Sequence, residues 1–200
     1  MTIYRIHPDR MHYQLMASSS EQVISKLGRE YPFHIDPAPK TYAHVWKPLE
    51  VSFYDSSSGK IKAKQPDITV SYGRLFLNEE AYAGLEALIS ADGEALPVTV
   101  EGAGAIIFNP LKCAEDFNAV DTKCSTRNEW GDLKSLAFFE DKIDRAVLFR
   151  CEFEGFTGLF CNDRFKGLVE ELQLKGVIFS ADLGNIFPID SSVMSNKKHH

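Results

Sequence analysis

The chain has 200 residues, of which 44% are hydrophobic and 12% aromatic, so it can bury a sizeable core and is not a mostly disordered chain. The 22 Lys and Arg residues against 28 Asp and Glu residues leave a net charge of −6, which disfavours nonspecific binding to nucleic acid or anionic lipid. We therefore expect no nucleic-acid partner, and the acidic balance suits a basic protein partner.

The N-terminal sequence lacks the apolar run and the cleavage site of a signal peptide, and no later segment approaches membrane-spanning length. These features predict a cytoplasmic protein without membrane contact. The four cysteines form no Cys-x-x-Cys pair, so we expect thiols that pack mostly as small hydrophobic groups. Residues 195–200 are interpreted as a tail, either native or derived from a purification tag.

The N-terminal part is predicted to hold one short helix among extended segments. The sequence SSSE at residues 18–21 supplies the start of a helix over 22–28, and Gly28 ends it. Four prolines within residues 31–48 predict an ordered but irregular loop that its aromatic side chains hold in place. The other expected elements are an extended segment at 3–15, strands at 49–54 and 67–71, a turn at 55–59 and a segment at 60–64.

The next part is predicted to be a strand that runs directly into a helix. A strand at 73–77 ends in the sequence LFLNE, and Asn78 or Glu79 then starts an amphipathic helix over 81–90. The expected elements after this helix are strands at 96–100 and 105–108, joined by a glycine-rich turn at 101–104.

Residues 111–153 are predicted to form turns and short strands around an acidic segment. Glu115, Asp116 and Asp121 form the best local cluster of carboxylates, which could serve acid–base chemistry or cap turns. The expected elements are a turn at 125–131, strand-like segments at 138–141 and 146–153, and a turn at 154–157 that leads as a hairpin into 158–161.

A second strand-then-helix segment then resembles the first. The sequence LFCND at 159–163 matches LFLNE, and Asn162 is placed to cap a helix over 163–174, followed by a strand at 177–181. We therefore predict an α+β fold with mixed or antiparallel sheets, a few helices and two similar strand-then-helix units. The chain is expected to form a single domain over residues 1–194, or two lobes that meet near residues 100–110.

Motifs for cofactor or metal chemistry are absent from the sequence. The histidines lack the spacing of a zinc site, no Gly-x-Ser-x-Gly elbow occurs, and the turn at 101–104 lacks both the Lys-Ser/Thr of a Walker sequence and the three glycines of a dinucleotide fingerprint. We therefore expect no catalytic residue, no metal and no cofactor.

A tight binding surface needs aromatic anchors surrounded by polar groups. Trp130 is the preferred anchor, and the competing interpretation is that both tryptophans are core or loop-packing residues. The candidate partner-binding residues are Trp130, Asp116, Asp121, Glu129, Asp132, Tyr42 and Trp46.

Three segments carry a resemblance to a known family: residues 113–125 with Val120-Asp121, the strand AVLFR at 146–150, and LFCND together with residues 172–179. Mainly over residues 105–181, the chain resembles a bacterial immunity-protein family of polymorphic toxin systems, formerly a domain of unknown function. The resemblance implies a cytoplasmic α+β protein that binds a cognate toxin, often delivered by neighbouring cells through a secretion system such as type VI, and neutralises it by occlusion without catalysis. The alternatives are a hydrolase-like enzyme with a site assembled from Asp116, Asp121 and a distant His or Cys, and an adaptor or self-assembling protein.

Overall fold

A computed structural model describes residues 1–55 and 63–187 of the chain. In this part the helices are α1 (Ser20–Leu27), α2 (Glu79–Ile89) and α3 (Asp163–Glu171). The strands are β1 (Ile3–Pro8), β2 (Leu15–Ser18), β3 (Leu49–Tyr54), β4 (Ile68–Ser71), β5 (Arg74–Asn78), β6 (Gly93–Val100), β7 (Ala103–Pro110), β8 (Thr126–Arg127), β9 (Leu133–Ser135), β10 (Leu148–Phe149), β11 (Leu159–Asn162) and β12 (Val177–Ser180). Most of the expected turn and segment over 55–64, and the tail, lie outside the described residues.

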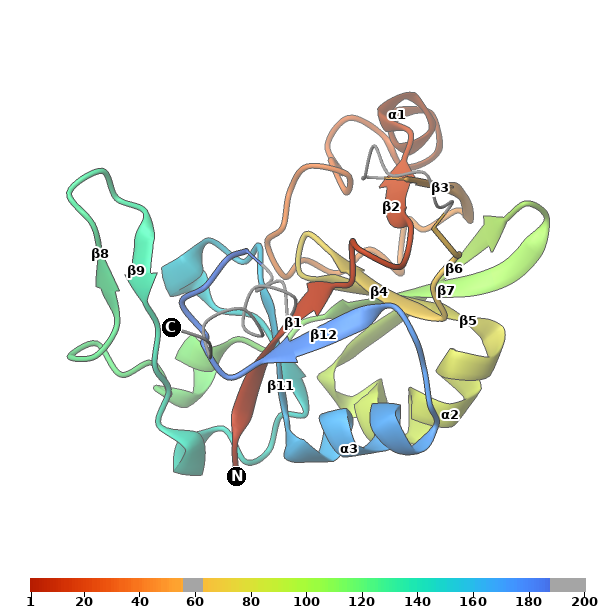
Figure 1. The fold of residues 1–200 in the computed structure, drawn as a ribbon. Coiled ribbons are helices and arrows are strands. Elements are labelled where there is room, and N and C mark those ends of the chain that lie inside the picture. Colours follow the sequence, from red (N-terminus) through yellow and green to blue (C-terminus); the bar gives the residue numbers. More distant parts are fainter. Residues whose placement is uncertain (56–62, 188–200) are drawn as a thin grey trace, which may run out of the picture.

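The strands form two larger sheets and one separate hairpin (Figure 1). The six-stranded sheet has the order β2-β3-β6-β7-β5-β4, in which only the β3–β6 pair is parallel. The four-stranded sheet has the order β10-β11-β1-β12 and is antiparallel throughout. The predicted α+β class with mixed and antiparallel sheets is thus confirmed.

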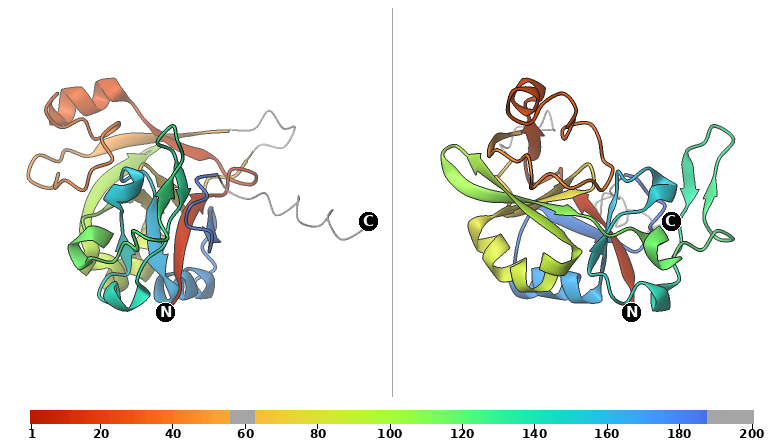
Figure 2. Two further views of the ribbon diagram at one scale, coloured as in Figure 1. Left: turned by 90° about the vertical axis from the view of Figure 1, so that its left-hand side faces the viewer. Right: turned by 180° about the vertical axis from the view of Figure 1, so that it is seen from behind.

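The largest hydrophobic core joins the two sheets to the helices α2 and α3. Side chains from β1, β5, α2 and α3 meet there, including Ile6, Leu77, Leu85 and Phe165, none of which is more than 2% exposed. The two helices lie side by side along one end of the molecule (Figures 1 and 2). Burial of these apolar side chains is the main force that holds the two sheets in one body.

Both predicted asparagine caps are present where a strand runs into a helix. The Asn78 side chain accepts a hydrogen bond from the amide of Ala81 at 2.8 Å. The Asn162 side chain accepts from the amides of Arg164 at 3.0 Å and Phe165 at 3.2 Å. These bonds satisfy amides that the first turn of a helix leaves without partners, so each helix starts where the sequence indicates.

Residues 31–48 form the irregular loop that the prolines predict, and two buried arginines hold it. Arg150 is fully buried and donates to the carbonyls of Pro37 at 2.7 Å and Gly73 at 2.8 Å, and to Oδ1 of Asn109 at 2.6 Å. Arg74 lies beside Arg150 and donates to two other carbonyls within residues 31–48, those of Phe33 at 2.9 Å and Asp36 at 2.7 Å. Burial, followed by repulsion from Arg74, lowers the pKa of Arg150 to about 9, so the group stays charged at neutral pH. The loop is therefore an integral part of the folded body.

The structure differs from the predicted elements around the acidic segment. The expected strand at 146–153 shrinks to Leu148–Phe149, because the amide of Val147 bonds to the buried carboxylate of Asp92 at 2.8 Å and Glu152–Glu154 forms a 3-10 helix. Of the expected strand at 138–141, only Phe138 forms a bridge, to Val120, and Glu140–Lys142 is a 3-10 helix instead. The expected turn at 125–131 belongs to the β8–β9 hairpin, whose strands are too short to show an alternating pattern.

Candidate functional site

The hairpin formed by β8 and β9 extends away from the rest of the molecule (Figures 1 and 2). Trp130 lies in its connecting turn and is 79% exposed, more than any other large hydrophobic side chain in the described part of the chain. A tryptophan at the tip of a projecting hairpin is unusual, because burial of a large aromatic side chain normally stabilises the fold. The interpretation that Trp130 packs inside the molecule is therefore wrong.

Hydrogen bonds hold the turn around Trp130 in one conformation. Oδ1 of Asn128 accepts from the amides of Trp130 at 3.0 Å and Asp132 at 2.8 Å. The backbone closes the same turn, since the Asn128 amide donates to the Asp132 carbonyl at 2.8 Å. Arg127 donates from Nη1 to the carbonyl of Gly131 at 2.5 Å. A partner therefore meets a turn that is already ordered, which lowers the entropic cost of binding.

The base of the hairpin is attached to the body by side-chain contacts. Arg127 donates from Nη2 to the carbonyl of Phe153, and its guanidinium lies 5.2 Å from the centre of the Phe153 ring. Across the two strands, the hydroxyls of Thr126 and Ser135 lie 2.8 Å apart, and Ser135 donates to the Cys124 carbonyl at 2.7 Å. These contacts define the direction in which the hairpin points.

Two carboxylates flank Trp130. Glu129 and Asp132 are both exposed, and Oδ2 of Asp132 accepts from the Asn128 amide group at 3.1 Å. The tip thus combines an apolar ring with negative charge, while the guanidinium of Arg127 is directed to carbonyls of Gly131 and Phe153. Such a surface complements a basic partner.

Asp116 and Asp121 cap turns, as the structural interpretation predicts. Oδ2 of Asp116 accepts from the Cys113 amide at 3.0 Å, and Oδ1 of Asp121 accepts from the amides of Lys123 at 2.9 Å and Cys124 at 3.2 Å. The amide bond from Lys123 lowers the pKa of Asp121. Asp121 belongs to the turn that precedes β8 and helps to shape the base of the hairpin, whereas Asp116 belongs to a separate turn.

The remaining two candidates, Tyr42 and Trp46, lie in the proline-rich loop, away from the hairpin (Figure 1). Tyr42 is fully buried and packs edge-on against Phe33, so its assignment to a partner surface is wrong. Trp46 is half-buried, packs against the same Phe33 ring and donates from Nε1 to the Pro97 carbonyl at 2.8 Å. Their predicted role in holding the loop is confirmed, because aromatic rings buried on one another stabilise an otherwise irregular segment.

The cysteines near the acidic segment are poorly suited to nucleophilic catalysis. Burial raises the pKa of Cys113 to about 11 and also raises that of Cys151, whose thiol donates to Glu115 at 3.2 Å. The hydrogen bond to Asp121 raises the pKa of the exposed Cys124. Because the thiolate is the reactive form, these shifts disfavour a cysteine nucleophile. Among residues 1–55 and 63–187, no three His, Cys, Asp or Glu side chains gather as a metal site would require.

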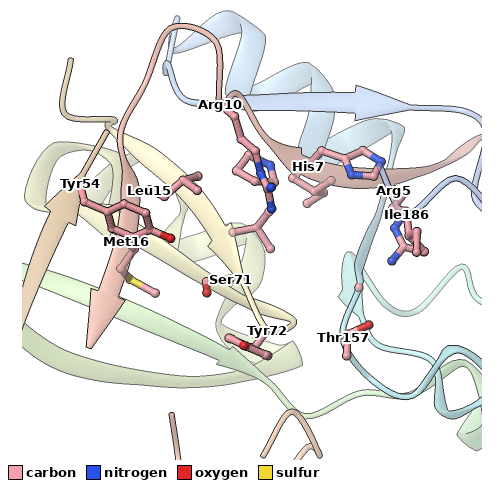
Figure 3. A pocket seen from close by; sticks show the side chains of 14 residues that line it. Arg5, His7, Arg10, Leu15, Met16, Tyr54, Ser71, Tyr72, Thr157 and Ile186 are labelled. Atoms are coloured by element: carbon pink, nitrogen blue, oxygen red, sulfur yellow. The ribbon is translucent and has the colours of Figure 1, made fainter. Parts of the chain in front are cut away.

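A cavity of about 400 Å³ lies between β1 and the strands β2 and β4 (Figure 3). Sequence reasoning missed it, because its walls come from segments that are far apart in the chain. No local pattern announces such a site, since each lining residue looks like an ordinary strand or turn residue in its own segment. Its lining includes Arg5, His7, Arg10, Tyr54, Tyr72, Thr157 and Ile186.

Comparison with protein-family models and with curated proteins finds no match for this chain. Among the described residues, no helix combines the length and the apolar character needed to cross a membrane.

Proposed function

We propose that this chain is an immunity protein that binds a cognate toxin and neutralises it by occlusion, with the tip of the β8–β9 hairpin as its anchor. The observation that carries the proposal is the 79% exposure of Trp130 on a turn that hydrogen bonds already order. The resemblance to immunity proteins over residues 105–181 supplies the toxin as the class of partner, and the hairpin lies within that range.

The energy available from Trp130 is sufficient for a dominant contact. A tryptophan buries 150–250 Å², and at about 25 cal/mol per Å² the exposed four-fifths of this side chain corresponds to a transfer free energy of roughly 3–5 kcal/mol, of which a part offsets the entropic cost of association. Residues that contribute this much are rare in interfaces and are most often Trp, Tyr or Arg. The hairpin therefore offers the kind of anchor on which a tight inhibitor depends.

The negative charges at the hairpin tip and on the whole chain favour binding to a positively charged toxin surface. Glu129 and Asp132 flank the ring, and the chain carries a net charge of −6. An acidic tip with an aromatic anchor would complement a toxin surface that carries positive charge around an apolar hollow. Binding should then be faster at low ionic strength.

The test is co-expression with the product of the adjacent gene, once that product is shown to be toxic when expressed alone, followed by calorimetric titration of the two purified proteins. We expect a stoichiometric complex and protection of the cell. Trp130→Ala should weaken binding by about 30-fold or more, the equivalent of 2 kcal/mol. Phe187→Ala is the matched control, because Phe187 is 70% exposed but lies outside the hairpin.

Two failures are distinguishable. If the chain neither binds nor protects against that toxin, the immunity function is wrong for this pair. If it binds and protects while Trp130→Ala matches the native chain, the function stands and the hairpin is not the anchor.

A further inference from the structure

The cavity between β1 and the strands β2 and β4 has the size of a ligand site. Its volume of about 400 Å³ lies within the range of small-molecule pockets. In Figure 3, His7 lies on one side of the hollow, Tyr72 and Thr157 lie on the opposite side, and Ile186 lies at one end. Side chains from distant segments of the chain therefore meet around one hollow.

The alternation of side chains along β1 places a histidine in the wall of this cavity. Ile6 belongs to the largest hydrophobic core, so Arg5 and His7 face the other side of the sheet. Arg5 forms an ion pair with Glu154 at 3.1 Å and donates to the Leu183 carbonyl at 3.1 Å. The charge of Arg5 is thus compensated inside the protein, and His7 is the polar group of β1 that is available to a ligand.

His7 is buried without a hydrogen bond to its Nε2 atom. It is 3% exposed, and within the described part of the chain this nitrogen has no partner. Such a group is an exception, because an unpaired buried polar atom destabilises the fold. Burial lowers the pKa of His7 to about 4, so the ring is neutral at pH 7.

The neutral ring of His7 indicates which chemical group would pair with it. A neutral imidazole carries a proton on only one of its two nitrogens, so Nε2 is a donor in one tautomer and an acceptor in the other. A hydroxyl group both donates and accepts, and it therefore pairs with Nε2 in either tautomer.

The opposite side of the cavity offers apolar surface that water reaches. Tyr72 is 53% and Ile186 48% exposed, although both are large hydrophobic side chains. A tight turn holds Tyr72 in place, since both Tyr72 and Gly73 have positive φ, of 48° and 67°. Exposed apolar groups around a hollow mark a surface that a ligand can cover.

We propose that this cavity binds a small uncharged aromatic molecule with a hydroxyl group, such as a phenol or a naphthol. The hydroxyl pairs with Nε2 of His7, and the ring covers Tyr72 and Ile186. Water would satisfy the nitrogen and leave the apolar side chains uncovered, whereas a hydrocarbon would cover them and leave the nitrogen unpaired. This site is separate from the hairpin and does not depend on the proposed function.

Equilibrium dialysis with a matched pair of probes tests the proposal. The first probe is 2-naphthol, and the second is 2-methylnaphthalene, in which a methyl group replaces the hydroxyl. A cavity without a group that pairs with the hydroxyl prefers the more apolar methyl compound. We expect the opposite order for the native chain at pH 7, with 2-naphthol bound at least about fivefold more tightly, since pairing a buried unpaired nitrogen supplies such a factor. Tighter binding of 2-methylnaphthalene, or binding of neither probe, would overturn the proposal.

Three variants assign the binding to this cavity. His7→Leu removes the ring nitrogens and should reverse the order, so that 2-methylnaphthalene binds more tightly. Tyr72→Ala should weaken both probes. His44→Leu is the control, because it removes an exposed histidine outside the lining and should keep the native order. A His7→Leu variant that still prefers 2-naphthol would refute the role of His7.

A further measurement uses the native chain alone and covers the case in which His7→Leu does not fold. In nitrogen NMR spectra of the isotope-labelled chain, the Nε2 signal of His7 should shift when 2-naphthol is added. The signal should move much less with 2-methylnaphthalene, because only the hydroxyl forms a hydrogen bond with the ring. An Nε2 signal that does not move at saturating 2-naphthol would overturn the proposal.

Discussion

Replacement of Arg150 by methionine tests how the proline-rich loop is held to the body. The guanidinium is fully buried and joins three segments, through the carbonyls of Pro37 and Gly73 and the side chain of Asn109. Methionine keeps much of the apolar volume of the side chain and removes all of these donors. The substitution therefore measures the hydrogen bonds more than the packing.

The magnitude follows from the acceptors that lose their partner. Each buried acceptor left without a donor costs about 1–3 kcal/mol, so three of them set a gross loss of roughly 3–9 kcal/mol. Release of the guanidinium from its costly burial returns several kcal/mol. We expect Arg150→Met to lower the free energy of unfolding by about 3–4 kcal/mol, a large fraction of the 5–15 kcal/mol typical of a domain.

Urea unfolding at pH 7, followed by circular dichroism, measures this change. Arg145→Met is the control, because Arg145 is exposed and its loss should matter by no more than about 0.5 kcal/mol. Limited proteolysis should also cut Arg150→Met faster within residues 31–48. A loss of less than 1 kcal/mol, with the loop as resistant as in the native chain, would show that the arginine does not support the loop.

Other predictions concern pH, capping and the hairpin. The pKa of His7 is about 4 in the folded chain and 6.5 in the unfolded chain. Its contribution to the free energy of unfolding is therefore fully present above pH 6.5 and is lost as the pH falls toward 4. The difference between the two pKa values corresponds to a loss of at most about 3 kcal/mol. Urea unfolding at pH 7 and 4.5 should show a larger drop in the free energy of unfolding for the native chain than for His7→Gln. Equal drops in the two chains would contradict the lowered pKa of His7. The Asn162 side chain caps α3 and also donates to the Ala146 carbonyl at 3.2 Å. Asn162→Ala should therefore lower the free energy of unfolding by about 2 kcal/mol in the same urea measurement. The loss should exceed that of Asn78→Ala, because Asn162 is fully buried. Trp130→Ala should change the free energy of unfolding by less than about 0.5 kcal/mol, and a larger loss would show that the ring supports the fold.

Local signals in the sequence predicted much of the fold. Ser19 and Asn162 start helices because a side-chain oxygen can satisfy the first helical amides, a relation that spans only a few residues. The turn predicted at 101–104 is present but shorter, since β7 begins at Ala103, and Gly102 adopts its positive φ without the cost that other residues incur. The prolines of residues 31–48 excluded a regular element there in the same local way.

Only the tertiary structure decided which aromatic side chains are exposed and which polar ones are buried. Tyr42 and Trp130 look alike as candidates in the sequence, yet one is fully buried and the other is 79% exposed, because exposure depends on which distant segments fold over a residue. The sequence likewise does not indicate the hydrogen bonds of Arg150, because Pro37, Gly73 and Asn109 come from three distant segments. The cavity with Arg10, Tyr54, Tyr72 and Ile186 likewise exists only after the two sheets pack together, since sequence periodicity describes one element at a time and a site between elements requires their long-range packing.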